Sequence, residues 1–188
     1  HGSDERSNRR YYASADRKDV TENLTGYGEQ AYLAKTLTKW TVSPSADLLQ
    51  PLVLQLEMAE AKRGLTGGGE AAVAIFPSRM TSEFPSELHQ TEEWREEQEI
   101  KPRKNEFFFY KPFVLEVEYR IHPPAGYRVR ELPESETLQL ATASLAKKFV
   151  VEDDGTVFAS YRVDSGPRRI SAAQFEEMRK AIVRLNEE

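Results

Sequence analysis

Apolar and charged residues alternate most clearly in the middle of the chain. Phe113, Leu115, Val117, Tyr119 and Ile121 are apolar, and charged residues occupy most of the positions between them. Successive side chains of a β-strand point to opposite faces of the sheet, so this pattern predicts a strand with one buried and one solvated face. We therefore expect Leu115, Val117 and Tyr119 in the core of the protein.

A second alternating stretch, residues 52–58, is followed by an apolar run over residues 71–76. Glycine occupies four of the six positions between 64 and 69, where a reversal of the chain would lie. These features predict one long hairpin with a glycine-rich tip. Later in the chain, Asp153-Asp154-Gly155 predicts a tight turn between two strands, because glycine adopts the positive φ that such a turn requires.

Helical spacing appears near both ends of the sequence. Ala31, Ala34, Leu37 and Trp40 recur at steps of three, which predicts a helix that ends before Pro44. Ser171, with Gln174 three residues later, forms the pattern of a capping box and predicts the start of a C-terminal helix. The apolar face expected for this second helix consists of Phe175, Met178, Ile182 and Leu185.

Strands joined by hairpin signals predict a mainly β protein, namely an antiparallel β-sandwich of immunoglobulin-like or similar type. It would carry an N-terminal helix and a C-terminal helix. The expected organisation has three parts. Residues 1–18 are a tag remnant (His1-Gly2-Ser3) and a flexible lead-in, residues 19–45 are a linking segment with a helix, and residues 46–188 are the sandwich with its closing helix. Residues 86–106, the most charged stretch, are expected to form a surface loop with at most a helical turn.

Composition excludes several classes of function. The 26 Lys and Arg residues against 31 Asp and Glu residues give a net charge of -5, which argues against a general nucleic-acid binder. The chain has no cysteine, so it contains no thiol nucleophile, disulfide or cysteine-based zinc site. No apolar run reaches the length of about 20 residues that a membrane-spanning helix needs.

Candidate chemistry is sparse. The glycine cluster resembles the start of a phosphate-binding loop, but Glu70 and Ala71 stand where lysine and a hydroxyl residue would be required. His89 lies among glutamates without a second histidine at helical spacing, which favours a solvated loop over a metal site. Glu116 and Glu118 are neighbours on one strand face, a weak basis for a carboxylate hydrolase. We expect no catalytic residue, no metal and no cofactor in this chain.

One aromatic run is the strongest candidate for an interaction site. Phe107, Phe108, Phe109 and Tyr110 are consecutive, and Phe113 follows shortly after them. Neighbouring strand residues point in opposite directions, so the run places apolar area on both faces of a strand. Either the chain buries both faces itself, or the run contacts another domain, because contiguous apolar surface marks interfaces.

A succession of short motifs resembles a known family. The motifs are Tyr110-Lys111-Pro112-Phe113, Pro123-Pro124-Ala125-Gly126-Tyr127, Leu132-Pro133, Asp154-Gly155-Thr156-Val157, Tyr161-Arg162-Val163 and Arg169-Ile170 followed by a helix. Together they resemble the C-terminal β-domain, a domain of unknown function, of exported bacterial proteins that carry a transglutaminase-like core. The resemblance covers roughly residues 20–186.

This resemblance implies a non-catalytic accessory domain. The catalytic core of such a protein uses a Cys-His-Asp site, and this chain has no cysteine, so no catalytic residue is carried over. The implied partner is the rest of the parent protein or a neighbouring envelope protein, in the periplasm or at the cell surface. Two alternatives remain open. One is a stand-alone glycan- or cell-wall-binding module that uses Tyr11, Trp94 or Tyr127, and the other, less favoured, is the carboxylate hydrolase.

Overall fold

The computed structural model describes residues 3–62, 64–67, 69–73 and 78–187. Contacts within the chain divide it into two compact units, His1–Ala74 and Ile75–Glu188. The boundary between these units therefore lies about thirty residues beyond the boundary expected at residue 45, because the strand over residues 54–59 pairs with the strand over residues 36–42 of the first unit.

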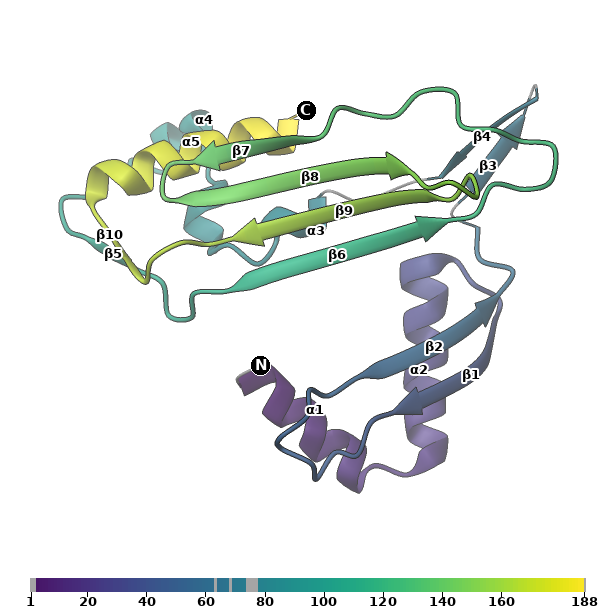
Figure 1. The fold of residues 1–188 in the computed structure, drawn as a ribbon. Helices are drawn as coiled ribbons and strands as arrows, with labels where there is room; N and C mark the ends of the chain where they lie inside the picture. Colours follow the sequence, from purple (N-terminus) through teal and green to yellow (C-terminus); the bar gives the residue numbers. More distant parts are fainter. Residues whose placement is uncertain (1–2, 63, 68, 74–77, 188) are drawn as a thin grey trace. The chain divides into compact units, whose positions relative to one another are not determined.

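Unit 1 combines two helices with two short hairpins (Figure 1). Asp16 caps the second helix by accepting a hydrogen bond from the Lys18 N–H. Trp40 Nε1 donates to Thr21 Oγ1 at 2.9 Å, which ties the first hairpin to that helix. The elements are α1 (Ser3–Ser14), α2 (Arg17–Tyr32), β1 (Thr36–Val42), β2 (Leu54–Ala59), β3 (Gly64–Gly67) and β4 (Glu70–Val73).

Three predictions for this part of the chain were wrong. The helix ends at Tyr32, where Leu33 turns into the left-handed region, and Trp40 lies in strand β1. The three-residue spacing of apolar side chains therefore continued past the end of the helix into a strand rich in β-branched residues. The expected flexible lead-in contains helix α1. Strand β2 pairs with β1 and not with residues 71–76, while β3 pairs with β4. Residues 74–76 of the predicted strand lie outside the described residues.

Unit 2 is built on a four-stranded antiparallel sheet in the order β6-β9-β8-β7 (Figure 1). A separate two-stranded ribbon, β5 with β10, lies near one end of the sheet. The strands are β5 (Phe107–Phe108), β6 (Val114–Ile121), β7 (Glu136–Leu140), β8 (Ala143–Val151), β9 (Val157–Asp164) and β10 (Arg169–Ile170). The helices are α3 (Ser78–Thr81), η1 (Ser86–His89), α4 (Glu92–Glu97) and α5 (Ala172–Glu187).

Local predictions for unit 2 are confirmed. Exposure alternates at every residue of β6, with Leu115, Val117 and Tyr119 on the more buried face. Gly155 has φ +84° in the turn between β8 and β9. The capping box is formed in both directions, because Gln174 N donates to Ser171 Oγ and Ser171 N donates to Gln174 Oε1. The charged stretch 86–106 is the exception: it contains η1 and the helix α4 where a surface loop with at most a helical turn was expected, because Leu88 and Arg95 are buried against the rest of unit 2.

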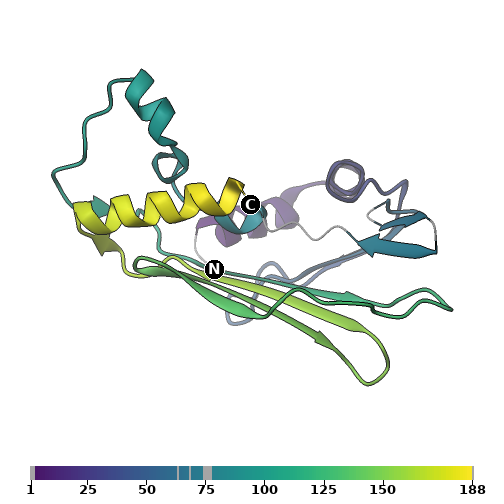
Figure 2. The ribbon, with the colours of Figure 1, turned by 90° about the horizontal axis from the view of Figure 1, so that it is seen from above.

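The core of unit 2 lies between the sheet and helix α5. Phe175, Met178 and Ile182 are fully buried against Leu145 and Val163 of the sheet. Burial decreases along the strands: Val163 and Leu145 are buried, whereas Val151, at the far end of β8, is exposed. Figure 2 shows the same relationship, with α5 over one end of the sheet and the strands continuing beyond it. The chain is thus a β-rich protein of small antiparallel sheets with a helix near each end.

Candidate interaction surface

The aromatic run forms strand β5 and alternates between core and solvent. Phe107 is 7% exposed and Phe109 is 1% exposed, whereas Phe108 is 50% and Tyr110 is 84% exposed. The Phe107 ring lies 5.2 Å from the Phe109 ring and 4.8 Å from that of Phe175 on α5. One side of the run therefore belongs to the core of unit 2, and the other side faces solvent.

Phe113, the fifth residue of the predicted interface, is partly covered by the chain itself. Its ring contacts the buried Phe84 ring at 5.2 Å. Its backbone exchanges two hydrogen bonds with Ser165, which is fully buried: Phe113 N donates to Ser165 Oγ at 2.8 Å, and Ser165 N donates to the Phe113 carbonyl at 3.0 Å. Of the five candidate residues, Phe108 and Tyr110 thus offer the most surface to a partner.

Three arginines surround these aromatic rings. The Arg169 and Arg168 guanidinium carbons lie 4.8 Å and 5.4 Å from the Phe108 ring centre. Arg103 lies over both Phe107 and Phe175, at 5.0 Å and 4.8 Å. Cations favour the electron-rich faces of aromatic rings, so these contacts hold the guanidinium groups in place at the surface. Arg103 thus contacts the rings on the core side of β5, whereas Arg168 and Arg169 contact Phe108 on its solvent side. We refer to Phe108, Tyr110, Arg168 and Arg169 as the aromatic–arginine patch.

The turn before β10 brings two of these arginines to the patch. Gly166 has φ +74°, and a Cβ atom there would lie 2.2 Å from the Thr142 carbonyl oxygen. Only glycine fits this close approach. The turn directs residues 168–170 alongside β5, where Phe109 N donates to the Arg168 carbonyl at 2.8 Å. Sequence reasoning missed the arginines, and the available signal was the excess of basic residues in 101–111 and the adjacent pair Arg168-Arg169.

A buried arginine fixes α5 to the segment that precedes the patch. Arg179 is 1% exposed and donates to the Gln90 carbonyl at 2.6 Å, to Glu92 Oε1 at 2.5 Å and to Glu176 Oε2 at 3.0 Å. The hydrogen bond from Arg179 lowers the pKa of Glu92 below its ordinary value. Arg95, also buried, lies 3.4 Å from the other oxygen of Glu176.

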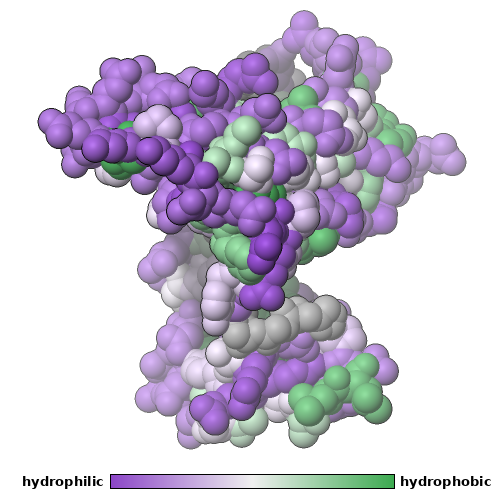
Figure 3. All heavy atoms as spheres, turned by 90° about the vertical axis from the view of Figure 1, so that its left-hand side faces the viewer, coloured by the Kyte–Doolittle hydropathy of each residue, from purple (hydrophilic) through white to green (hydrophobic). Residues whose placement is uncertain are grey.

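This ionic cluster borders a groove between α4 and α5. The groove has a volume of about 430 Å³, and its lining includes Glu92, Glu96, Glu99, Pro102 and Lys180. It is thus mainly acidic, although it ends next to the basic residues that lead into the patch. Figure 3 views the molecule from the side drawn at the left of Figure 1 and shows mostly hydrophilic residues there, with apolar residues between them.

A second groove lies among the loops at the other end of the sheet. It has a volume of about 680 Å³, and Tyr127, Arg128 and Leu132 contribute to it together with the two prolines at 123 and 124. Two of the residues considered for glycan binding are on different parts of unit 2: Trp94 is in α4, and Tyr127 is in the loop between β6 and β7. Figure 1 draws that loop and α4 at opposite ends of the sheet. His122, which directly follows β6, is exposed, and its Nδ1 forms a hydrogen bond with Oγ1 of the buried Thr156 at 2.8 Å.

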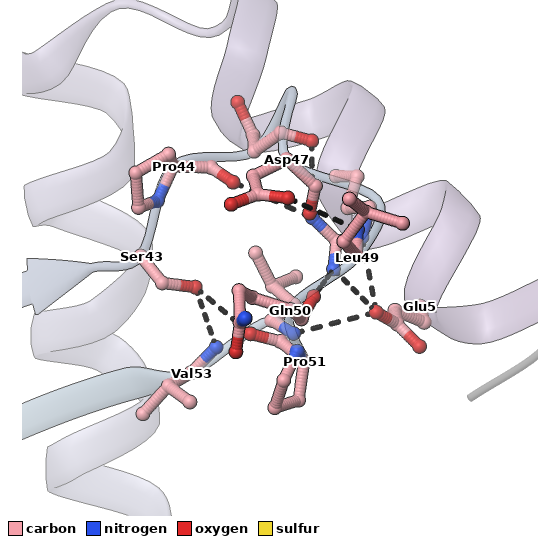
Figure 4. A network of polar contacts seen from close by, with 11 residues as sticks. Glu5, Ser43, Pro44, Asp47, Leu49, Gln50, Pro51 and Val53 are labelled. Atoms are coloured by element: carbon pink, nitrogen blue, oxygen red, sulfur yellow. Dashed lines mark hydrogen bonds and ion pairs between the residues drawn. The ribbon is translucent and has the colours of Figure 1, made fainter.

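Unit 1 contains its own buried arginine. The Arg9 guanidinium donates to the carbonyls of Pro44, Ser45, Asp47 and Gln50, at distances from 2.5 to 3.4 Å. It also forms an ion pair with Glu5, and this contact lowers the pKa of that carboxyl group. Figure 4 shows the loop between β1 and β2 folded around this network with Glu5. The arrangement fastens α1 to the loop between β1 and β2.

The described residues contain no group of three or more histidines or carboxylates placed to hold a metal ion. The His89 ring contacts the Asn186 side chain at 3.1 Å. Among the same residues, no helix combines the length and apolar character needed to cross a membrane. Comparisons with protein-family models, curated proteins and solved structures give no match to this chain.

Proposed function

We propose that this chain is a non-catalytic interaction domain of the kind that its motifs resemble, the C-terminal β-domain of exported bacterial transglutaminase-like proteins. The exposed side of the aromatic run, Phe108 with Tyr110, is the contact surface in this proposal. Its partner is the rest of the parent protein or a neighbouring envelope protein, in the periplasm or at the cell surface.

The observation that carries the proposal is the exposure of Tyr110 next to a rigidly held strand. Its side chain is 84% exposed although residues 107 and 109 are anchored in the core. A large aromatic side chain on a fixed backbone offers contact area at little cost in conformational entropy, and such residues are enriched at the centres of interfaces. Phe108 extends the same surface.

The partly uncovered sheet supports the finer prediction of a sandwich. Helix α5 packs on the end of the sheet that contains Val163, whereas Val151, on the same face at the far end, is 44% exposed. A sheet of this kind is stabilised when a second layer covers its remaining apolar surface. In this proposal the partner supplies that layer and thereby completes a sandwich-like arrangement.

The experiment begins with the reading frame that encodes the chain. If an upstream region carries a Cys-His-Asp core, that region and this chain are produced separately and their association is measured by titration calorimetry. We expect Tyr110→Ser to weaken the association by about tenfold or more, because truncation of a central aromatic anchor typically costs about 2 kcal/mol. Glu118→Gln, an exposed change on the polar face of β6, is the control and should leave the affinity unchanged.

Absence of any association between the two parts would overturn the proposal. So would an association that Tyr110→Ser and Phe108→Ser leave unaltered.

A specific observation also favours glycan binding as a second candidate. The groove of about 680 Å³ carries Tyr127, which is 38% exposed, with Arg128 beside it. Sugar rings stack on aromatic faces and accept hydrogen bonds from arginine. A glycan array with the wild-type chain and Tyr127→Ala tests this candidate, because a signal lost in the variant would assign the groove to glycans.

A further inference from the structure

The two segments that contain the aromatic–arginine patch differ in charge from the rest of the chain. Residues 101–111 and 166–170 contain six basic residues and one acidic residue, a local charge of +5, whereas the whole chain carries -5. The remaining residues therefore carry -10 together. The basic residues are Lys101, Arg103, Lys104, Lys111, Arg168 and Arg169.

One guanidinium group of the patch has no acidic partner in the described part of the chain. Arg168 contacts the Phe108 ring but forms no ion pair there. Arg169 forms one, with Glu106 at 3.5 Å, and both side chains of that pair are mostly exposed. The rings orient the charged groups without neutralising them, so the patch remains an electropositive surface with apolar area at its centre.

From this geometry we infer that the partner surface is a short acidic segment of a protein, with aliphatic residues between its carboxylates. The inference rests on the proposed function and specifies the chemistry of its partner. Carboxylates would pair with Arg168 and Arg169, since guanidinium groups match carboxylate geometry. The aliphatic residues would pack against Phe108 and Tyr110, which are 50% and 84% exposed.

The acidic groove formed by the segment that leads into β5 distinguishes a peptide segment from an extended polyanion. Five glutamates lie between residues 92 and 99, and Glu92, Glu96 and Glu99 share a groove with Pro102. A nucleic acid or an anionic bilayer extends its negative charge well beyond a small patch and would meet these glutamates. The repulsion opposes binding. A short acidic segment occupies the basic surface alone.

The test uses the full chain and a synthetic peptide in which Glu alternates with Val. Fluorescence anisotropy measures the affinity of this peptide at low and at physiological salt. We expect saturable binding that weakens with salt, and a loss of about tenfold in affinity for Arg168→Glu. Lys148→Glu is the matched control: it makes the same change in net charge on the exposed polar side of β8 and should leave the affinity unaltered. A peptide with Gln in place of Glu should bind at least tenfold more weakly.

Several results would overturn the inference. One is equal binding of the Glu and Gln peptides, and another is equal loss of affinity in Arg168→Glu and Lys148→Glu. Tighter binding to phosphatidylglycerol vesicles or single-stranded DNA than to the peptide would assign the patch to a polyanion. Self-association of the chain that Arg168→Glu abolishes, measured by sedimentation, would make a second copy the occupant.

The failures of the two proposals are distinguishable. If the chain binds its parent core but Arg168→Glu leaves that affinity and its salt dependence unchanged, the acidic partner is wrong while the interaction domain stands. If the chain does not bind the core at all, the proposed function itself fails.

Discussion

Arg179 on α5 donates a 2.6 Å hydrogen bond to the carbonyl oxygen of Gln90, a residue 89 positions earlier in the sequence. The contact joins the helix that covers the sheet to the segment that enters α4 and then the aromatic run. Because the guanidinium is almost completely buried, its partners have to satisfy it within the protein.

Replacement of this arginine should destabilise unit 2. In Arg179→Met, the Gln90 carbonyl and the partly buried Glu176 lose a charged donor, and we expect a loss of about 3 kcal/mol in the free energy of unfolding. Urea denaturation in a Trp40→Phe background measures this, because Trp94 of α4 then reports on unit 2 alone. Arg184→Met, an exposed change on the same helix, should have little effect, and equal losses in both variants would contradict the assignment.

The same network predicts how stability responds to acid. The pKa of Glu92 is lowered from its ordinary value of 4.5 by the Arg179 hydrogen bond, so the ionised form is favoured by folding. Its contribution is fully present above pH 4.5 and is lost as the pH falls through the lowered pKa of the folded state. Glu92→Gln should therefore weaken the acid-side dependence of stability in chemical denaturation. If the free energy of unfolding changed with pH in the same way in wild type and variant, this ion pair would contribute nothing to the pH dependence of stability.

Two neighbouring phenylalanines should respond in opposite ways. Phe109 is 1% exposed, so Phe109→Ser should cost about 3–5 kcal/mol. Phe108 is half-exposed, and its replacement removes mainly its contacts with arginines. Phe108→Ser should therefore lower the free energy of unfolding by about 1 kcal/mol or less. Thermal denaturation of the two variants measures the difference. A large loss of stability in Phe108→Ser would mean that this side chain serves the core and not an interface.

Strand β6 offers a similar test of which face is buried. Leu115 lies beside the fully buried Val163 in the register of the sheet, and we expect Leu115→Ala to cost about 2 kcal/mol. Glu116→Ala, on the solvated face, should stay within about 0.5 kcal/mol of wild type. Both are measured by urea denaturation, and equal effects would indicate that the faces of the strand are misassigned.

In unit 1, Arg9 should be as important as Arg179 is in unit 2. Arg9→Met removes the donors that hold four loop carbonyls, and we expect a loss of about 2–3 kcal/mol, read from Trp40 in a Trp94→Phe background. The Leu49 and Val53 amide hydrogens should also exchange faster with solvent, because the loop loses the guanidinium group to which its carbonyls are bonded. Arg10→Met is the exposed control, and unchanged exchange in Arg9→Met would contradict this role.

Local chemistry alone determined much of unit 2. The alternation of residues 113–121, the turn at Gly155 and the capping box at Ser171 each depend on a few adjacent residues, so the sequence was sufficient to place them. The aromatic run was likewise visible as a candidate surface. Its division into a buried and an exposed side follows from the two-residue period of a strand, but which side faces the core was decided by Phe175 on a distant helix.

Other features depended on contacts between residues far apart in the sequence. Pairing of β2 with β1, burial of Arg9 and Arg179, and convergence of Arg103, Arg168 and Arg169 on the aromatic rings all join such segments. The sequence of a short apolar strand does not specify which strand it pairs with. An arginine is expected at the surface unless the fold supplies buried carbonyls that accept its hydrogen bonds. The sequence by itself thus determined several local elements of unit 2, whereas the helix end and the strand pairing of unit 1 did not follow from it. Only the tertiary structure decided which strands pair, which charges are buried and where the aromatic–arginine patch forms. These outcomes depend on which apolar side chains must be buried and which polar groups need hydrogen-bond partners after distant segments have packed together.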